Sequence, residues 1–368
     1  MFRAFCFVCL AVLTGCIPRP SLLVNPEAAQ VGEVTRVFFA TAREPLTGID
    51  FGTERALDVR FGQIGVSVPP QHEPGQVEVT DQVPDPTRHF VAAENAAYDT
   101  DVAFRTALAR DLRARPRGAR EAVIFVHGFN TNFAEGVFRV AQLSHDFGIT
   151  AQVIHYSWPS LGHPLGYAYD RDSALFARDG LEDLIRTVNA AGAESVVLIG
   201  HSMGAHLSME AMRQLAIRAP KSVPNYVDGV VLISPDIDVQ VFLSQTKRID
   251  VLPDPFVIFV SKKDRALALS ARLSGESNRL GNVENAQRIA DLDVTVVDVS
   301  QFSQGFDLGH FTVGSSPALL SIFGQLPSVG ALIAGDQSGR TGLLTGTVLT
   351  VQNATEIILS PISAISGP

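Results

Sequence analysis

The chain has 368 residues, of which 46% are hydrophobic and 18% charged, and its formal net charge at pH 7 is −9. This length and composition supply enough apolar material for a large folded core, which excludes disorder of the whole chain. The acidic balance argues against nucleic acid and anionic lipid headgroups as partners, because both are bound through clustered Lys and Arg side chains.

The first fifteen residues, 1–15, have the features of an export signal. Arg3 supplies the positive start, and Phe5 to Leu13 supply an apolar run that is too short to span a bilayer. The next segment, Leu13-Thr14-Gly15-Cys16, resembles the lipobox of bacterial lipoprotein precursors, in which the chain is cut before the Cys and the thiol is lipidated. The alternative is an ordinary signal peptide followed by an unrelated Cys16.

Lipidation at Cys16 would decide where the protein resides. The other cysteines, Cys6 and Cys9, lie inside the segment predicted to be removed, so the mature domain would contain no disulfide. Acyl chains contribute about 0.8 kcal/mol of membrane affinity per buried methylene. Residue 17 is Ile, whereas an Asp there tends to retain Gram-negative lipoproteins at the inner membrane. The resemblance therefore implies a protein anchored in the bacterial cell envelope, on the periplasmic side of the outer membrane if the source is Gram-negative.

The residues before the main core divide into two parts. Residues 16–34 contain several Pro and Asn residues and little periodicity, which is typical of a tether. Residues 35–115 are predicted to form a small β-rich extension, with apolar stretches at 37–40 and 64–68, followed by a lead-in helix over 101–114.

Residues 116–325 alternate short apolar runs with amphipathic stretches of helical length, the longest at 172–191 and 203–218. The runs that predict buried strands are 122–126, 152–156, 195–199, 229–233, 256–260 and 294–298. This alternation predicts an α/β fold with a mostly parallel sheet covered on both faces, and ligand sites in such folds lie at the carboxyl ends of the strands. Residues 326–368 are rich in Gly, Ser and Thr, and three interpretations stay open for them: a final strand pair, a mobile extension or a partner segment.

The pentapeptide Gly200-His201-Ser202-Met203-Gly204 directly follows one predicted strand and precedes a predicted helix. This is the setting of a nucleophile elbow, in which a tight turn lifts a serine into a cleft. The glycines permit the turn because a side chain at either position would meet neighbouring backbone, and the helix N-terminus favours developing negative charge. Ser202 is therefore the predicted nucleophile.

A serine hydroxyl becomes a good nucleophile only when a base, usually an imidazole oriented by a carboxylate, takes its proton. In proteins with such an elbow the acid and then the base follow the serine along the chain, which leaves His206 and His310 as candidate bases. His206 falls inside the elbow helix, where its ring is expected to pack. His310 follows the last strong strand in a loop and is the predicted base.

The carboxylate should stand at the end of a strand between the serine and the base. Asp264, just beyond the strand at 256–260, is the predicted acid. The alternative is the pair Asp236 and Asp238, which follows the preceding strand; otherwise these two would cap and brace their loop.

Attack on a carbonyl also requires donors for the oxyanion, each worth roughly 3 kcal/mol. Met203 is predicted to supply one backbone N–H, and Phe129, in the segment Val126-His127-Gly128-Phe129-Asn130 after the first core strand, the other. His127 is interpreted as a loop brace. No His pairing at ligand spacing indicates a metal, and no Gly-rich phosphate loop is present, so the chemistry is expected to need no cofactor.

Several segments occur together with the elbow: Phe38 to Arg43, His127 to Asn130, Tyr156 to Pro159, Ser234 to Asp238 and Asp264 to Leu267. As a set they resemble a bacterial family of uncharacterised α/β-hydrolases with esterase- or lipase-like character. The resemblance spans residues 36–325. It implies the α/β-hydrolase fold and the triad Ser202, Asp264 and His310.

Together these features predict a serine hydrolase that cleaves a carboxylic ester, from a small molecule or a lipid, through an acyl-Ser202 intermediate. Two alternatives stay open. The same residues would serve a thioesterase or an acyltransferase, and the chain could instead be a non-catalytic envelope-binding lipoprotein built on a hydrolase scaffold.

Overall fold

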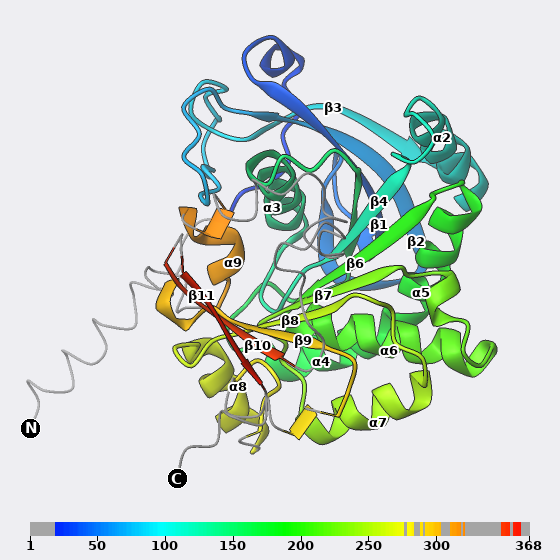
Figure 1. Cartoon of the computed structure of the whole chain (residues 1–368). Coiled ribbons are helices and arrows are strands. Elements are labelled where there is room, and N and C mark those ends of the chain that lie inside the picture. The colour runs from blue at the N-terminus through cyan, green and yellow to red at the C-terminus, as the bar shows by residue number, and fades with distance from the viewer. Residues whose placement is uncertain are drawn as a thin grey trace, which may run out of the picture.

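The structure is a computed structural model that describes residues 19–275, 278–282, 288–289, 291–302, 310–317, 319–320, 347–353 and 356–361. The strands among these residues are β1 (Glu33–Pro45), β2 (Phe51–Val68), β3 (Val91–Tyr98), β4 (Glu121–Val126), β5 (Gln152–Ser157), β6 (Ser195–His201), β7 (Gly229–Ile233), β8 (Phe256–Val260), β9 (Thr295–Asp298), β10 (Thr347–Asn353) and β11 (Glu356–Pro361). They form one 11-stranded sheet in the order β11-β10-β9-β8-β7-β6-β4-β5-β1-β2-β3 (Figure 1).

The described helices are α2 (Asp101–Arg113), α3 (Phe133–Asp146), α4 (Tyr167–Phe176), α5 (Arg178–Ala190), α6 (Met203–Arg218), α7 (Val239–Ile249), α8 (Arg265–Ser274) and α9 (Thr312–Ser315), with the 3-10 turns η2 (Pro26–Gln30), η3 (Val223–Asn225) and η5 (Ser300–Phe302). They cover the sheet on both sides. Apolar side chains of α2, α5, α6 and α7 form one core cluster with the sheet, and those of α3 and α9 contribute to a second cluster on the opposite face (Figure 1).

The centre of the sheet is parallel, as the sequence predicts. Strands β5, β4, β6, β7, β8 and β9 pair in parallel registers. Strands β7 and β8 are buried along their whole length, which explains their continuous runs of apolar and β-branched residues. Their carboxyl ends meet along one edge of the sheet, and the loops after them carry the candidate site. The predicted α/β-hydrolase architecture is confirmed.

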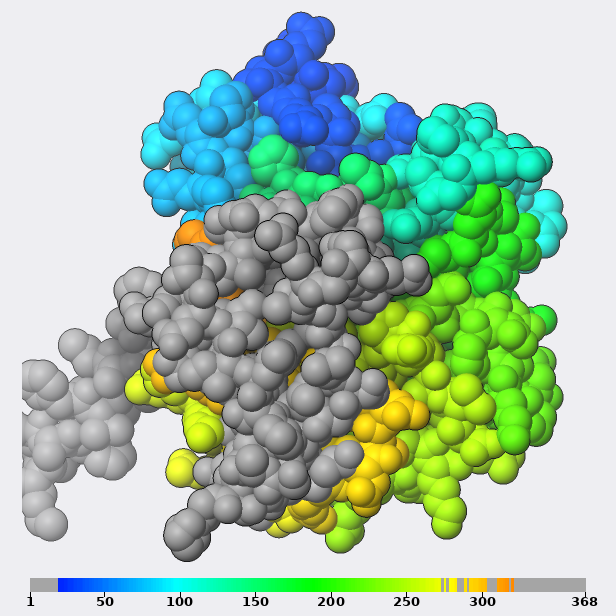
Figure 2. Space-filling view, in the orientation of Figure 1, coloured from blue at the N-terminus to red at the C-terminus, as the bar shows by residue number. Residues whose placement is uncertain are grey.

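The N-terminal strands extend this same sheet. Strand β1 pairs in parallel with β5 and antiparallel with β2, and β2 pairs antiparallel with β3. In the space-filling view the blue to cyan residues of this N-terminal part form one end of the molecule, and the green and yellow residues of the core form the other (Figure 2). The β-rich extension is therefore continuous with the core.

Residues 19–34, which fall within the predicted tether, lie against the folded core in the structure. Leu22 and Ala28 are buried, and Asn25 donates its backbone N–H to Ala92 O at 2.8 Å. The predicted signal segment and Cys16 lie outside the described residues.

The C-terminal segment that the sequence left open contains a strand pair. Strand β10 runs parallel to β9, and β11 pairs antiparallel with β10 at the edge of the sheet. None of the helices formed by the described residues is both long and apolar enough to span a bilayer.

Candidate active site

Ser202 occupies the sharp turn between β6 and α6. Its backbone has φ 53° and ψ −119°, a region that non-glycine residues rarely adopt. The turn is held by the N–H of Ser202, which donates to Ile233 O at 2.9 Å on the neighbouring strand β7. A Cβ on Gly204 would lie 2.3 Å from the carbonyl oxygens of Val126 and His127, so the elbow requires glycine there.

Asp264 and His310 come together beside the end of strand β8. Asp264 Oδ2 lies 2.7 Å from His310 Nδ1, and the exposed fractions of the two side chains are 1% and 16%. The second carboxylate oxygen, Oδ1, accepts from the backbone N–H of Leu267 at 2.9 Å and so caps α8. The carboxylate is thereby fixed by one oxygen and orients the imidazole with the other.

His310 and the residue after it, Phe311, also pack on the elbow. The ring of His201, the residue before Ser202, lies 4.8 Å from the ring of His310 and 4.6 Å from that of Phe311. Burial holds the pKa of His201 well below its usual range, so this ring is neutral near pH 7 and adds no positive charge beside His310. The structure therefore places the predicted nucleophile, acid and base at one edge of the sheet.

Asp236 and Asp238, the alternative acids, make other contacts. Asp236 Oδ1 lies 3.1 Å from Arg279 Nε, and the hydroxyls of Tyr167 and Ser270 donate to the two oxygens of this carboxylate at 2.9 and 2.6 Å. Asp238 Oδ1 accepts backbone N–H groups at the start of α7. Both residues brace the loops beside the site, and the contact with His310 is made by Asp264.

The two predicted oxyanion donors lie on adjacent elements. Met203 is the first residue of α6, so its N–H belongs to the helix N-terminus that follows Ser202. Phe129 lies in the loop between β4 and α3, and its ring packs edge-on against Tyr167, with 5.6 Å between centroids. The backbone of this loop approaches the elbow closely, because a Cβ on Gly128 would lie 3.0 Å from Ser202 Cβ.

His127 connects the loop after β4 to the loop after β5 by packing and hydrogen bonds. Its ring stacks on Trp158 at 4.8 Å and 10°, and Trp158 Nε1 donates to His127 O at 2.7 Å. Burial, followed by the nearby charge of Arg43, lowers the pKa of His127 well below its usual range. The ring nitrogens lie 2.8 and 3.0 Å from the carbonyl oxygens of Gly128 and Trp158. A neutral ring donates to one of them, and in either tautomer His127 acts as the brace predicted from the sequence.

Arg43 is a further organising residue that the sequence analysis did not single out. Its side chain is fully buried and donates to Ser157 Oγ at 2.9 Å, to Gly52 O and Ser160 O at 3.0 Å each, and to Thr131 O at 2.8 Å. Burial lowers the pKa of Arg43 to about 10, so the guanidinium remains charged at neutral pH. A lone Arg at the end of the apolar stretch Phe38 to Ala42 is the signal that could have identified it.

A cavity of about 400 Å³ adjoins the elbow on the α3 side of the sheet. Its lining includes Gly128 and His201 from the site, Phe125 and Phe311 from the apolar core, and Pro20 from the N-terminal segment. The described residues contain no group of three or more His, Cys, Asp or Glu side chains arranged to bind a metal ion.

The parallel sheet and the strained serine at the β6–α6 turn define an α/β-hydrolase. The family described as "Alpha/beta hydrolase of unknown function (DUF900)" matches residues 100–326, which is more than half of the chain, and the chain belongs to this family. No curated protein matches the sequence.

Solved structures show distant similarity. Lipase B from Aspergillus fumigatus is 16% identical, with coverage of 57% of this chain and 53% of the lipase and a TM-score of 0.34. A lipase-esterase related protein from Clostridium acetobutylicum is 17% identical, with 48% and 73% covered and a TM-score of 0.23. Esterase 2 from Thermogutta terrifontis, phosphoramylated by tabun, is 11% identical, with 67% and 84% covered and a TM-score of 0.29. The chain thus spans about half the length of lipase B.

Proposed function

We propose that this protein is a serine hydrolase that cleaves carboxylic esters, with Ser202 as nucleophile, His310 as base and Asp264 as acid. The observation that carries the proposal is the 2.7 Å contact between Asp264 Oδ2 and His310 Nδ1, on a loop whose rings pack against the serine elbow. A carboxylate, an imidazole and a strained serine at one edge of a parallel sheet are the parts that acyl transfer requires.

The first half of the reaction forms the acyl-enzyme. His310 Nε2 takes the Ser202 proton while Ser202 Oγ attacks the ester carbonyl, and Asp264 stabilises the imidazolium that results. The carbonyl oxygen becomes an oxyanion, which the N–H groups of Phe129 and Met203 stabilise. The tetrahedral intermediate collapses when the C–O bond to the leaving alkoxide breaks, and His310 returns its proton to that oxygen, which releases the alcohol.

The second half repeats these steps with water. His310 removes a proton from the water as its oxygen attacks the acyl carbonyl, and the second tetrahedral intermediate expels Ser202 Oγ, which takes the proton back. The products are the carboxylic acid and the regenerated serine. A thioester would follow the same route with a thiol as leaving group, and an acyltransferase would replace the water with another alcohol.

The proposal is tested with Ser202→Ala, assayed by fluorophosphonate labelling and by hydrolysis of p-nitrophenyl esters. Both signals should be abolished, because no other hydroxyl occupies the elbow. Ser208→Ala is the matched control: this serine is also buried in α6, and its hydroxyl donates to Gly204 O at 2.8 Å. Labelling and hydrolysis that survive in Ser202→Ala would reject the assignment. A folded wild-type protein without either signal would support a non-catalytic envelope lipoprotein instead.

We also propose that Cys16 carries the lipid anchor and that the enzyme acts at the bacterial cell envelope, on the periplasmic face of the outer membrane in a Gram-negative source. The support is the lipobox-like segment that ends at Cys16. Replacing Cys16 with Ser should move the protein from the membrane fraction to the soluble fraction. Retention of the variant in the membrane fraction would contradict lipidation at this residue.

A further inference from the structure

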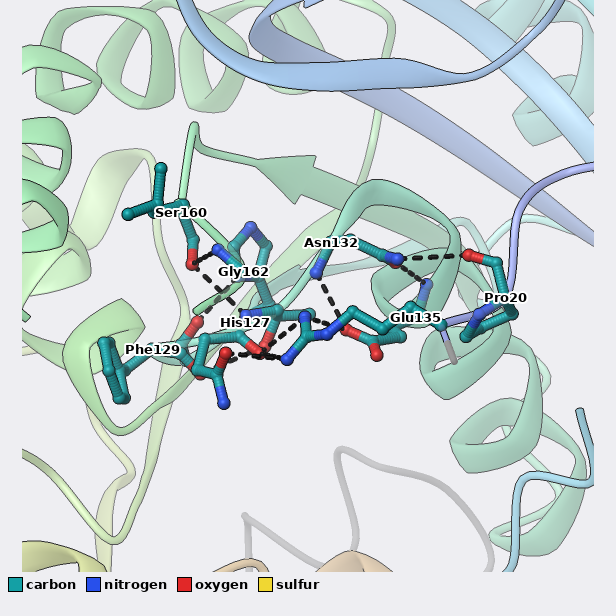
Figure 3. A network of polar contacts seen from close by, with 12 residues as sticks. Pro20, His127, Phe129, Asn132, Glu135, Ser160 and Gly162 are labelled. Carbon is teal, nitrogen blue, oxygen red and sulfur yellow. Dashed lines mark hydrogen bonds and ion pairs between the residues drawn. The ribbon is translucent and has the colours of Figure 1, made fainter. Parts of the chain in front are cut away.

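The first described residues, Arg19 to Leu22, form a segment that we call the N-terminal strap. Arg19 Nη2 donates to Asn130 Oδ1 at 2.6 Å, and both terminal nitrogens of Arg19 lie 3.1 Å from Asn130 O. The next residue of the strap, Pro20, accepts a hydrogen bond at its carbonyl oxygen from Asn132 Nδ2, at 3.1 Å (Figure 3). The strap is therefore bound directly to the loop between β4 and α3.

The residue that the strap holds is the neighbour of a predicted oxyanion donor. Asn130 follows Phe129 and has a positive φ of 59°, so its conformation depends on the contacts around it. Its N–H donates to Asp170 Oδ2 at 3.2 Å, while its carbonyl and side-chain oxygens accept from Arg19. Asp170 in the core thus binds the backbone N–H of Asn130, and Arg19 binds its carbonyl and side-chain oxygens.

Arg19 is also bound on its other side. Arg19 Nη1 lies 3.0 Å from Glu135 Oε2, and the same carboxylate oxygen accepts from the N–H of Asn132 at 2.8 Å in the capping box that begins α3 (Figure 3). A Cβ on Gly162 would lie 3.0 Å from Arg19 Nη1, so the guanidinium also lies against the loop after β5. These contacts hold the planar guanidinium in an orientation in which it donates to both oxygens of Asn130.

The strap closes one side of the cavity beside the elbow. Pro20 lines this cavity together with Asn130 and Glu135 on the loop side, and with His201 and Phe311 on the side of the elbow. The strap therefore contributes to the site in two ways: it holds the loop that carries Phe129, and it forms part of the wall next to the elbow.

We propose that Arg19 is a positioning residue for the reaction, acting through Asn130 to hold the N–H of Phe129 where the oxyanion develops. This inference rests on the proposed ester hydrolysis. Cleavage before Cys16 would leave Arg19 in the mature chain, three residues after the lipidated position. The segment that ties the enzyme to the membrane would then continue directly into one that completes the active site.

The experiment uses the full-length chain in detergent and compares Arg19→Ala and Arg19→Lys with wild type. An oxyanion donor stabilises the developing oxyanion far more than the bound substrate, so Arg19→Ala should lower kcat about 10- to 100-fold with little change in KM. Its affinity for an alkylboronic acid, which forms a tetrahedral adduct with the serine, should fall in proportion to kcat/KM. Arg19→Lys should recover part of the loss, because an ammonium reaches one of the two Asn130 oxygens.

Two further variants separate positioning from general effects. Arg36→Ala removes an ion pair of similar length, 2.9 Å to Asp111, whose two residues lie on β1 and α2 away from the elbow, and it should leave kcat unchanged. Asn130→Gly keeps access to positive φ but removes the side-chain acceptor, and it should lower kcat less than Arg19→Ala does. It also provides the test if Arg19→Ala does not fold.

The outcomes distinguish this inference from the proposed function. If Ser202→Ala is inactive while Arg19→Ala keeps wild-type kcat and boronate affinity, the positioning role is wrong and ester hydrolysis stands. If Arg19→Ala raises KM and leaves kcat unchanged, the strap binds substrate and the positioning role is again wrong. If Ser202→Ala keeps its activity, the proposed function itself fails.

Discussion

Asp264 illustrates how one side chain can serve two elements. One carboxylate oxygen caps α8 through the N–H of Leu267, and the other holds His310 Nδ1. The cap fixes the carboxylate before any substrate binds, so the orientation of the imidazole follows from the local fold of the strand-to-helix turn. An asparagine could preserve the cap but would present a neutral amide to His310.

We therefore expect Asp264→Asn to lower kcat by about four orders of magnitude, because the imidazole would lose both its fixed tautomer and the charge that stabilises its protonated form. The melting temperature should change little, since Asn caps helices about as well as Asp. Steady-state kinetics and thermal unfolding measured on the same preparation check both statements.

Asp238→Asn is the matched control for this prediction. Asp238 caps α7 as Asp264 caps α8, and with Asp236 it forms the pair of alternative acids that the sequence offers. This variant should keep wild-type kcat. A large loss of kcat in Asp238→Asn, or no loss in Asp264→Asn, would indicate that the acid lies in the loop after β7 and not at Asp264.

The residues predicted to act in catalysis share one property that makes them recognisable in the sequence: each stands just after an apolar strand or in the loop after the last one. Arg43 also follows an apolar stretch, Phe38 to Ala42, but most of its contacts are with residues distant along the chain. Three of its partners, His127, Thr131 and Ser157, are more than 80 residues distant along the chain, and no local pattern indicates that they converge on one guanidinium. The contact between Arg19 and Asn130 could not be predicted from the sequence either, because these two residues are also distant along the chain.

At the level of elements, the sequence predicted the parallel strands well because these are buried on both faces, and the helix at 203–218 matches α6 residue for residue. The single helix expected at 172–191 is instead the pair α4 and α5, which meet at Ala177. There Tyr156 Oη donates to Ala177 O at 2.5 Å, a contact from a strand that helical periodicity cannot reveal. The long β2 was only partly anticipated, because its exposed half lacks an apolar run.

One contact between elements, which we call the His72 joint, involves a titratable group. His72, in the loop between β2 and β3, lies 2.9 Å from Glu78 Oε2 and 2.7 Å from Asp146 Oδ1 at the end of α3. Asp146 also accepts from the N–H of Gly75 at 2.7 Å, and a Cβ on Gly75 would lie 2.5 Å from Ser315 O on α9. The loop, α3 and α9 therefore meet close to the segment that carries His310.

Burial alone would lower the pKa of His72, but hydrogen bonds to Asp146 and Glu78 and their negative charges outweigh it and raise that pKa above 6.5. A raised folded-state pKa means that the stabilisation is complete below about pH 6.5 and is lost as pH rises through the folded value. The free energy of unfolding should therefore decrease across this range. His72→Gln, which can still donate one hydrogen bond, should not show the decrease.

Urea denaturation at a series of pH values from 6 to 9 checks this prediction, and hydrogen exchange of the 69–90 loop locates it. The exposed His163 provides the control, because His163→Gln removes a histidine without disturbing the joint. A decrease of equal size in wild type and His72→Gln would show that the joint is not the titrating element.

Across the whole molecule, a second set of histidines, which are buried or partly buried, produces the opposite pH dependence. Burial lowers the pKa values of His127, His155, His201 and His206 in the folded protein. Unfolding returns them to ordinary values near 6.5, so below that pH the unfolded chain binds more protons than the folded one. These histidines should therefore make the free energy of unfolding fall as pH decreases from about 6.5, whereas the contribution of His72 falls as pH rises above that value.

His155 offers the clearest test of that dependence. It is fully buried on β5, neither ring nitrogen has a hydrogen-bond partner among the described residues, and burial followed by the charge of Arg43 lowers its pKa to about 3. Replacing it with Leu, of similar volume, removes a proton that the unfolded chain gains between pH 7.5 and 5.5. The loss of unfolding free energy over that interval should be smaller in His155→Leu by about 1.4 kcal/mol.

The comparison needs urea denaturation of wild type and His155→Leu at both pH values, with His163→Leu as the exposed control. His155→Leu should also be at least as stable as wild type at pH 7.5, because it removes two buried polar atoms without partners among the described residues. Equal losses in wild type and His155→Leu would mean that His155 is not held neutral by burial. The acid sensitivity of the fold would then have to arise from the other buried histidines, of which His201 packs directly against the predicted base.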